Sequence, residues 1–482
     1  IFAIQDGNFI TPQIKKGTAY DTPKKTKTEH EVNMNWKDIY KEKTMTPQQA
    51  AQLIKSGDSM YTPLGLGQPS MAVMDAIADR KDELENVEYY SCLTMRPYKI
   101  FQPEYRKTFR LSSGFLGSPV LQEMARSKYA NYYPSNGSAG IVWFNEHRLR
   151  HAPDARVISI QQVSPPDEHG YVNTGLDSFM SKQNFDDAIK TNGHIIAQIN
   201  PHMPRCYGET NFHVSQFSAF IEIAEPLVEL PTPKAGDIEI AMAKNVVSLL
   251  KDRDCIQIGI GAVPMTVSKL LAESGLRDMG IHTEMVPAGI EKLVEKGVVT
   301  GKYKKNHTGK IIAGFSMGDK ETYDFCTNNP MIEFYGTYYT NSIWTIAAED
   351  NVKAINGSVE VDLLGQIVSE SIGDVMISGS GGQCDFAIGA FWSKGGRAIN
   401  LVPSTTSDGK ISRIVPYLQK GARMTVPRNY AGYIVTEYGI ADLYGKSEPE
   451  RAEALIKVAH PRFREELEKS ARERHLLFPR IF

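Results

Sequence analysis

Cysteine is scarce in this sequence, and its distribution argues against two kinds of stabilising site. The 482 residues include five cysteines, an odd number scattered along the chain. There is no CxxC pair, and no cysteines and histidines are grouped with the spacing of zinc ligands. The pattern therefore argues against a disulfide framework and predicts no metal site. It favours a reducing compartment, so we expect a cytoplasmic protein.

Basic charge and long apolar runs are also missing. The chain carries 54 Lys and Arg against 56 Asp and Glu, a formal net charge of -2, whereas nucleic-acid-binding proteins usually show a basic excess. No apolar run approaches the length of a membrane span. We therefore expect neither a nucleic-acid partner nor a membrane. The chain begins at Ile1 without methionine, which leaves the earlier removal of an organellar targeting segment open.

The length predicts more than one domain, because one hydrophobic core rarely serves 482 residues. The first 45 residues are polar and rich in lysine, so we expect an extension there. A linker-like stretch, LPTPKAGD, occupies residues 230–237. We place the boundary inside it. The prediction is an N-terminal α/β domain at 1–230, which includes the extension 1–45, and a C-terminal α/β domain at 231–482.

Two pairs of motifs recur at almost the same offset. GLGQP at 65–69 matches GIGAVP at 259–264, and each follows an apolar run and precedes a helical pattern. DEHGYV at 167–172 matches DLLGQI at 362–367. The first glycines of the first pair lie 194 residues apart, and the aspartates of the second pair 195. A shared offset indicates an internal duplication. The fold prediction is therefore α/β, with two similar open halves and the active site between them.

Residues 256–290 contain the most informative stretch. An apolar strand-like run meets the glycine loop, a helical pattern follows, and a short strand then ends at Glu284. A strand, glycine turn and helix can hold phosphate on backbone amides, although GxG alone also fits a tight turn. The loop lacks the third glycine of a dinucleotide fingerprint and the Gly-Lys-Ser/Thr of a P-loop. A nucleotide-bearing substrate held without hydride or phosphoryl transfer fits better.

Glu284 taken alone is typical of a surface charge at a helix start. Its position at the carboxyl end of a strand, beside the glycine loop, favours a nucleophile. The neighbouring His282 is typical of a structural histidine. GSGGQ at 379–383 follows another apolar run and could crowd backbone N–H groups around one point, as an oxyanion hole does. The alternative for this second glycine cluster is a strained turn.

Five motifs together resemble one family. GIGAVP at 259, IHTEM at 281, GSGGQCDF at 379, VTEYGIADLYGKS at 435 and VSPPDEHGYVNTG at 163 are similar to the acetyl-CoA hydrolase/transferase family of class I CoA-transferases. The resemblance covers roughly residues 46–475. It implies CoA transfer from an acyl-CoA to a small carboxylate, with Glu284 as the catalytic residue. The intermediates would be an acyl-glutamyl anhydride and a glutamyl-CoA thioester.

The resemblance also assigns roles to other residues. It implies that coenzyme A and its acyl thioester are substrates, that no cofactor is permanently bound, that no metal is needed, and that the protein is a homodimer. Glu437 and Asn341 would support the catalytic glutamate, Gly381 and Gly382 would stabilise the oxyanion, and Gln68 would face the site from the other half. The CoA-binding positions by match are Gly259, Ile260, Gly261, Ala262, Val263, Ser378, Gly382 and, in a loop near the CoA tail, Lys410.

Two alternatives stay open. One is an acyl-CoA hydrolase on the same fold, with water as the acceptor. The other is a CoA-binding protein without activity, against which the intact Glu284, GSGG and Glu437 speak. The sequence does not separate acetate, butyrate, 4-hydroxybutyrate or succinate as substrates. An arginine in the acyl pocket would favour a dicarboxylate, and Arg96 and Arg205 are the candidates.

Overall fold

The computed structural model describes residues 4–5, 8–9, 35–230, 234–259 and 261–477. It divides into two units, residues 1–34 and 35–482. In the first, β1 (Ile4–Gln5) pairs antiparallel with β2 (Asn8–Phe9). The second unit carries all the features discussed below. It opens with α2 (Trp36–Lys43) and with α3 (Pro47–Ala51), which starts at a capping box between Thr46 and Gln49.

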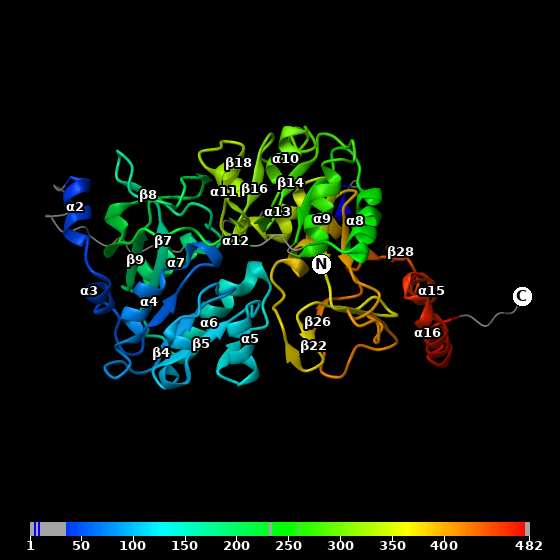
Figure 1. The fold of residues 1–482 in the computed structure, drawn as a ribbon, viewed down its shortest axis with the longest axis horizontal. Helices are drawn as coiled ribbons and strands as arrows, with labels where there is room; N and C mark the ends of the chain where they lie inside the picture. Colours follow the sequence, from blue (N-terminus) through cyan, green and yellow to red (C-terminus); the bar gives the residue numbers. More distant parts are fainter. Residues whose placement is uncertain (1–3, 6–7, 10–34, 231–233, 260, 478–482) are drawn as a thin grey trace, which may run out of the picture. The chain divides into compact units, whose positions relative to one another are not determined.

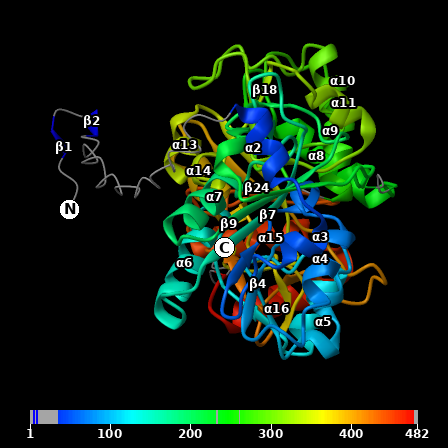
Figure 2. The same ribbon diagram turned by 90° about the vertical axis from the view of Figure 1, so that its left-hand side faces the viewer.

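The first half is built on a seven-stranded parallel sheet in the order β12-β9-β7-β3-β4-β5-β6. Its inner strand β7 is buried along its whole length, as expected when helices cover both faces of a parallel sheet. Figure 2 shows α6 and α7 on one side of β4, β7 and β9, and α3, α4 and α5 on the other. The strands are β3 (Ser59–Tyr61), β4 (Val87–Tyr90), β5 (Phe109–Ser113), β6 (Ala130–Tyr132), β7 (Val157–Val163), β9 (His194–Ile199) and β12 (Ala219–Glu222). The helices are α4 (Met71–Ala78), α5 (Pro119–Arg126), α6 (Gly140–His151) and α7 (Ser181–Lys190).

The second half is built on a nine-stranded sheet in the order β10-β18-β16-β14-β13-β19-β24-β27-β28, parallel except at the β27–β28 pair. Figure 1 shows β14 and β16 grouped with α8, α9 and α10. The strands are β10 (Tyr207–Gly208), β13 (Cys255–Ile258), β14 (Gly280–His282), β16 (Ile311–Ala313), β18 (Ile332–Phe334), β19 (Val352–Gly357), β24 (Arg397–Leu401), β27 (Tyr433–Thr436) and β28 (Gly439–Asp442). The helices are α8 (Asp237–Leu249), α9 (Ala262–Leu271), α10 (Ile290–Glu295), α11 (Lys320–Cys326), α12 (Thr337–Thr340), α13 (Ile343–Ala348) and α14 (Gln383–Trp392). Two further helices, α15 (Glu448–Val458) and α16 (Pro461–Glu473), follow the last strand of the sheet.

Short strands complete both halves. In the first half, β8 (Tyr171–Asn173) pairs with β11 (Asn211–His213). In the second, β15 (Met285–Val286) pairs with β17 (Phe315–Ser316), and β22 (Ser371–Ile372) with β23 (Val375–Met376). A four-stranded sheet has the order β25-β20-β21-β26. Its strands are β20 (Glu360–Asp362), β21 (Ile367–Val368), β25 (Ile414–Val415) and β26 (Met424–Val426).

The two large sheets share one topology. Read from one edge, β6-β5-β4-β3-β7-β9-β12 runs strand for strand with β18-β16-β14-β13-β19-β24-β27. In both halves the central strand leads past a pair of glycines into a helix: β3 through η1 (Gly65–Gly67) to α4, and β13 past Gly259 and Gly261 to α9. The common strand order agrees with the duplication predicted from the repeated motifs.

The repeated aspartate motif folds into the same turn in both halves. Asp167 Oδ1 accepts from the amides of residues 169 and 171, and the amide of Gly170 donates to the Asp167 carbonyl. Asp362 Oδ1 accepts from residues 364 and 366 in the same way, and Gly365 donates to the Asp362 carbonyl. Both glycines have a left-handed backbone, with φ of 82° and 92°. The aspartate caps its own turn, and the glycine permits it.

The halves join along a seam beside both glycine clusters. The amide of Gly137 donates to the Gly381 carbonyl at 2.7 Å, and that of Leu116 donates to the Ser378 carbonyl. β10, from the first half, adds an edge strand to the second sheet. The boundary between residues 230 and 231 stays a prediction, and residues 231–233 lie outside the described part of the chain.

Candidate active site

Glu284 lies just beyond the end of a strand of the second sheet, next to the seam between the halves. It follows β14 by two residues, and its backbone carbonyl accepts from the amides of Gly314 and Phe315 at 2.9 and 3.2 Å. Those bonds fix the carboxylate at the carboxyl end of the parallel sheet, against the seam between the halves. Burial raises its pKa to about 7, and the nearby Asp385 adds to the rise. A carboxyl group with this pKa is partly ionised at neutral pH and only weakly solvated.

Asn341 holds the carboxylate in one orientation. Its Nδ2 donates to Glu284 Oε2 at 2.6 Å, while its Oδ1 accepts from the Thr340 hydroxyl at 3.0 Å. The second bond fixes which end of the amide points at the glutamate. Asn341 is fully buried just after α12. Its hydrogen bond stabilises the ionised form and so lowers the pKa that burial raises. The predicted pairing of Asn341 with Glu284 is present.

The backbone of Gly382 packs against the Glu284 carboxylate. It caps the N-terminus of α14, and its amide acts on Glu284 to lower the pKa, as expected at the positive end of a helix. A Cβ at this position would lie 2.0 Å from Glu284 Oε2 and 2.5 Å from Asn341 Nδ2. Gly381, with φ of 50°, turns the chain into this approach. The GSGG cluster is therefore packed against the Glu284 carboxylate, and only glycine fits at position 382.

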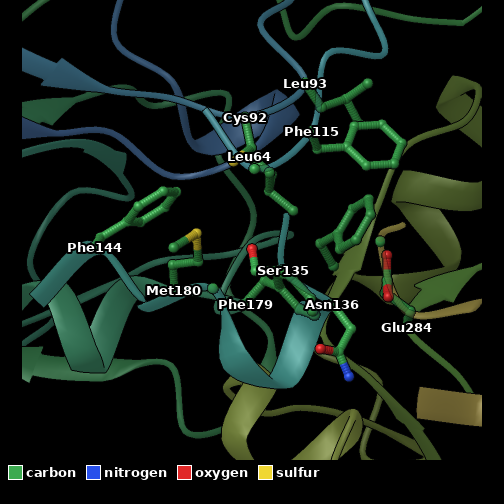
Figure 3. Close-up of a pocket in the computed structure, with 15 residues that line it drawn as sticks. Leu64, Cys92, Leu93, Phe115, Ser135, Asn136, Phe144, Phe179, Met180 and Glu284 are labelled. Carbon is green, nitrogen blue, oxygen red and sulfur yellow. The ribbon is translucent and has the colours of Figure 1, made fainter. Parts of the chain in front are cut away.

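Two cavities meet at Glu284. An open groove of about 380 Å³, whose lining includes four serines and five glycines, runs along Gly259, Gly357 and the Ser378–Gln383 turn. A smaller, mostly apolar cavity of about 60 Å³ is lined by phenylalanine, leucine and methionine side chains of both halves. Phe115, Glu284 and Gly381 line both. Figure 3 places Glu284 at one end of the smaller cavity and Phe144 and Met180 at the other. A thioester bound across this junction would put its carbonyl at the carboxylate.

The wall opposite Glu284 comes from the equivalent loop of the first half. Cys92 follows β4 by two residues, as Glu284 follows β14, and both line the apolar cavity. Gln68 holds this loop: its Nε2 donates to the Cys92 carbonyl at 3.4 Å, and its Oε1 accepts from the Met95 amide at 3.0 Å. Gln68 is fully buried and lines neither cavity. The structure thus gives it a support position, and direct contact with substrate stays a prediction.

The predicted CoA-binding positions are partly brought together. Gly259 and Ser378 line the open groove. Gly261, with φ of 127°, precedes α9, whose first residues are Ala262 and Val263. Ile260 lies outside the described residues. Lys410 is exposed, and its ammonium pairs with Asp408 at 3.4 Å, away from the residues that line the groove.

Glu437 is placed differently from the expectation. Its carboxylate accepts from the amide of Ser404 at 3.0 Å and from the Ser404 hydroxyl. Within the described residues, no direct hydrogen bond joins it to Glu284 or Asn341. It holds the start of the loop that carries Lys410, so its support of the catalytic glutamate stays a prediction.

Asp385 is the site residue that the sequence reasoning missed. It accepts from Asn136 Nδ2, from the Ser138 amide at 3.0 Å and from the Ser138 hydroxyl at 2.7 Å. These bonds fasten the first half to the helix that carries Gly382. Burial raises the Asp385 pKa to about 6. Asp385 stands inside the GSGGQCDF motif, three residues after Gly382, and this acid in an apolar helix was the available signal.

Three other residues singled out in the sequence, one histidine and two arginines, have structural partners. His282 is buried, burial lowers its pKa to about 3, and its Nε2 bonds the Thr340 carbonyl, so it is a neutral structural histidine. Arg96 pairs with Glu225 at 2.7 Å, and Arg205 pairs with Asp167 at 2.9 Å. Neither arginine lines the apolar cavity.

Asn341→Ala should shift the pH dependence of the reaction. Removing the hydrogen bond removes a cause that lowers the Glu284 pKa, so that pKa should rise above about 7. A Glu284 that attacks as a nucleophile must be ionised, and the acid limb of kcat/KM should then move to higher pH. Above the limb, kcat should fall by roughly 10- to 100-fold, the scale of a hydrogen bond to a charged group. Asn245→Ala, which removes an amide bonded to the Thr436 carbonyl, is the control. An unmoved or lowered inflection would contradict the assignment.

The described residues lack the features of a metal site and of a membrane span. Among them, no group of three or more His, Cys, Asp or Glu side chains is arranged to hold a metal ion. Within the same ranges, no helix has the length and apolar composition needed to cross a bilayer.

Comparison with known proteins assigns the family. The N-terminal domain of the acetyl-CoA hydrolase/transferase family matches residues 27–232, and its C-terminal domain matches residues 318–471. The chain is 40% identical to the 4-hydroxybutyrate coenzyme A transferase of Clostridium kluyveri, over 92% of this chain and 100% of that protein. It is 37% identical to the succinyl-CoA:cyclohexane-1-carboxylate CoA transferase of Geobacter metallireducens, over 90% and 96%. The crystal structure of RipA from Yersinia pestis superposes with a TM-score of 0.84, at 32% identity, over 92% of this chain and 100% of that one.

The chain therefore belongs to the acetyl-CoA hydrolase/transferase family. It is an enzyme of the CoA-transferase class, and the two-half α/β fold predicted from the sequence is confirmed.

Proposed function

We propose that this enzyme transfers CoA from an acyl-CoA to a short-chain carboxylate of the acetate, butyrate or 4-hydroxybutyrate type, through covalent intermediates on Glu284. One observation carries the proposal. The Glu284 carboxylate lies at the junction of an open groove and a smaller apolar cavity, with Asn341 and Gly382 against it. The groove has the size and backbone polarity for the pantetheine arm. The cavity suits a short acyl chain.

The first half-reaction loads CoA onto the enzyme. An oxygen of Glu284 attacks the thioester carbonyl carbon, the C–S bond breaks, and CoA leaves as a thiolate with an acyl-glutamyl anhydride in place. The thiolate then attacks the glutamyl carbonyl and expels the acyl group as a carboxylate. A glutamyl-CoA thioester remains. The backbone amide of Gly382 is placed to stabilise negative charge on the carbonyl oxygen as each tetrahedral intermediate forms.

The second half-reaction runs the same steps in reverse with a new carboxylate. The incoming carboxylate attacks the glutamyl-CoA carbonyl, which releases CoA thiolate and forms a new anhydride. The thiolate attacks the new acyl carbonyl, and the new acyl-CoA leaves with Glu284 again a free carboxylate. The anhydride keeps the acyl group activated throughout, which a serine ester would not do.

The cavity favours transfer over hydrolysis. Aromatic rings of Phe115, Phe179 and Phe315 line it beside Glu284, and such walls exclude water from the glutamyl thioester. A hydrolase would need a polar wall that holds and activates a water molecule. The homodimer and the cytoplasmic location stay predictions from the sequence; the mass of the native protein in solution would test the first.

The test is chemical trapping of the thioester. The protein is incubated with butyryl-CoA without an acceptor, treated with borohydride and digested. Reduction of the thioester to a primary alcohol should lower the mass of the peptide carrying Glu284 by about 14 Da, because a carboxyl group becomes a hydroxymethyl group. Acetate added before borohydride should abolish the change. Consumption of butyryl-CoA without any trapped glutamate would instead support direct hydrolysis, and neither consumption nor trapping with a panel of acyl-CoAs would support the binding protein.

A further inference from the structure

Residues 136–138 of the first half form a seam loop that reaches the two helices beside Glu284. The loop follows β6 and includes the start of η4 (Gly137–Ala139). Asn136 also lines the apolar cavity together with Glu284 (Figure 3). The seam loop therefore contributes to the substrate cavity on one side and to the junction with the second half on the other.

Asp385 anchors the seam loop to α14. Its carboxylate is fully buried, and it accepts from Asn136 Nδ2, from the Ser138 amide at 3.0 Å and from the Ser138 hydroxyl at 2.7 Å. Between these two residues, the Gly137 amide donates to the Gly381 carbonyl at 2.7 Å. A buried carboxylate needs such donors, so the loop and the glycine turn before α14 hold each other in place.

A second chain of hydrogen bonds leads from the seam loop to Asn341. The Thr337 hydroxyl donates to the Gly137 carbonyl at 2.9 Å, and the backbone amide of Asn341 donates to the Thr337 carbonyl at 3.0 Å. The Asn341 side chain then donates to Glu284 Oε2. Asn341 lowers the pKa of both Glu284 and Asp385, as an amide does when its N–H groups face two carboxylates. One side chain thus connects the loop, its anchor and the nucleophile.

The Gly137 position leaves no room for a side chain. A Cβ there would lie 2.5 Å from Asn341 Nδ2, 3.3 Å from Asn341 Cγ and 3.4 Å from Asp385 Oδ2. The φ angle of Gly137 is outside the left-handed range, so its backbone conformation does not require glycine. The close approach of the Asn341 amide is therefore the reason why glycine fits here.

We propose that the seam loop is a positioning element of the active site, which fixes the Asn341 amide and the Gly381–Gly382 turn against Glu284. The proposal rests on the function proposed above, in which Glu284 is the nucleophile. Gly137 touches no reacting atom and acts through Asn341. Because the loop belongs to the first half and the nucleophile to the second, the site is complete only when the two halves are docked.

The main test is Gly137→Ala, with the pH profile as the readout. The added methyl group should push the Asn341 amide away from Glu284, and the lost hydrogen bond should raise the Glu284 pKa. The acid limb of kcat/KM should therefore move to higher pH. Above the limb, kcat should fall by about 10- to 100-fold, the scale of a hydrogen bond to a charged group, while the KM for butyryl-CoA stays close to that of the wild type. The other groups that act on Glu284, the Asp385 carboxylate and the Gly382 amide, remain in this variant.

A double-mutant cycle shows whether Gly137 acts through Asn341. In an Asn341→Ala background the amide that the new methyl group would meet is gone. Adding Gly137→Ala to Asn341→Ala should therefore lower kcat by less than about 3-fold and leave the acid limb where Asn341→Ala puts it, since coupled residues do not add. Additive losses in the double variant would show that Gly137 acts on something else and would overturn the proposal.

Ser138→Ala is a milder second variant, because it removes one hydroxyl group at a partly exposed position. The loss of one donor to Asp385 should lower kcat by about 3- to 10-fold, the scale of a single hydrogen bond, and leave the KM unchanged. Ser138→Thr keeps a hydroxyl group and should restore most of the rate. If Gly137→Ala did not fold, this pair would decide, and a wild-type kcat in Ser138→Ala would overturn the proposal.

Tyr338→Phe is the control for a contact between the halves that lies outside the seam loop. It removes a hydrogen bond from the Tyr338 hydroxyl to Glu209 Oε2 at 2.6 Å, on the same helix α12. Tyr338 is 46% exposed and lines neither the groove nor the apolar cavity, so kcat and the acid limb should stay at their wild-type values. A lower melting temperature in Gly137→Ala with an unmoved limb and a wild-type kcat would show a purely structural contact and would overturn the proposal.

Borohydride trapping distinguishes this outcome from that of the proposed function. If the wild type yields the trapped Glu284 peptide while Gly137→Ala keeps the wild-type kcat and pH profile, the positioning role fails and the CoA transfer stands. If no acyl-CoA yields the trapped peptide from the wild type, the covalent transfer itself fails, and the positioning role fails with it.

Discussion

Glu284→Gln is expected to lower kcat for CoA transfer by roughly 10⁴- to 10⁶-fold, the scale of removing a covalent nucleophile. An amide nitrogen or oxygen does not attack a thioester, so neither the anhydride nor the glutamyl thioester forms. Acyl-CoA binding should survive. Glutamine has the same shape, and its carbonyl oxygen can accept from Asn341 Nδ2 in place of Glu284 Oε2. The affinity for acyl-CoA, measured by calorimetry, should therefore change little while turnover disappears.

A graded variant and a control sharpen this result. Glu284→Asp keeps the charge but withdraws the carboxylate by about one methylene, and a displacement of about 1 Å costs on the order of 100-fold in rate. Glu295→Gln makes the same chemical change on the exposed end of α10 and should leave kcat unchanged. A Glu284→Gln protein that retained more than a few per cent of its activity, with glutamine verified by mass, would remove Glu284 from the mechanism.

The duplication was readable from the sequence because both repeated motifs carry a local physical requirement. The glycine turn must let a strand enter a helix, and the aspartate must cap its own turn through a left-handed glycine at 170 or 365. Both requirements restrict which residues can occupy these positions, so the motifs are visible in the sequence. Glu284 follows β14 at the carboxyl end of the parallel sheet, whereas Gly382 was marked by its glycine cluster, which follows a strand of the antiparallel β22–β23 pair.

Contacts across the seam could not be read in this way. Asp385 meets Asn136 and Ser138 from about 250 positions away in the chain, and no local pattern announces the pairing. Gln68 was expected from the resemblance to face the site; in the structure it is buried and holds the Cys92 loop, and direct contact with substrate stays a prediction. Lys410 rested on the resemblance alone, and its exposed loop gives it Asp408 as a partner.

Gly382→Ala is expected to lower kcat by roughly 1000-fold, because it disturbs two contributions at once. The added Cβ would lie 2.0 Å from Glu284 Oε2 and 2.5 Å from Asn341 Nδ2, so the carboxylate must leave its hydrogen bond. Misplacing the nucleophile and weakening one oxyanion donor each cost on the order of 100-fold or more. Backbone strain is not the cause, since Gly382 has φ of -87° and ψ of -2°, which alanine also adopts.

Measurements of the melting temperature and the KM distinguish a loss of catalysis from a loss of folding or of substrate binding. Gly382→Ala should melt close to the wild type and bind acyl-CoA, yet give little trapped glutamyl thioester after borohydride. Gly357→Ala is the matched glycine control: it lines the same groove, and its added Cβ would meet nothing within 4 Å. That variant should keep its kcat and change KM at most. Wild-type kcat in Gly382→Ala would mean that the working carboxylate does not lie against this glycine, and the assignment of Gly382 to the oxyanion would fall with it.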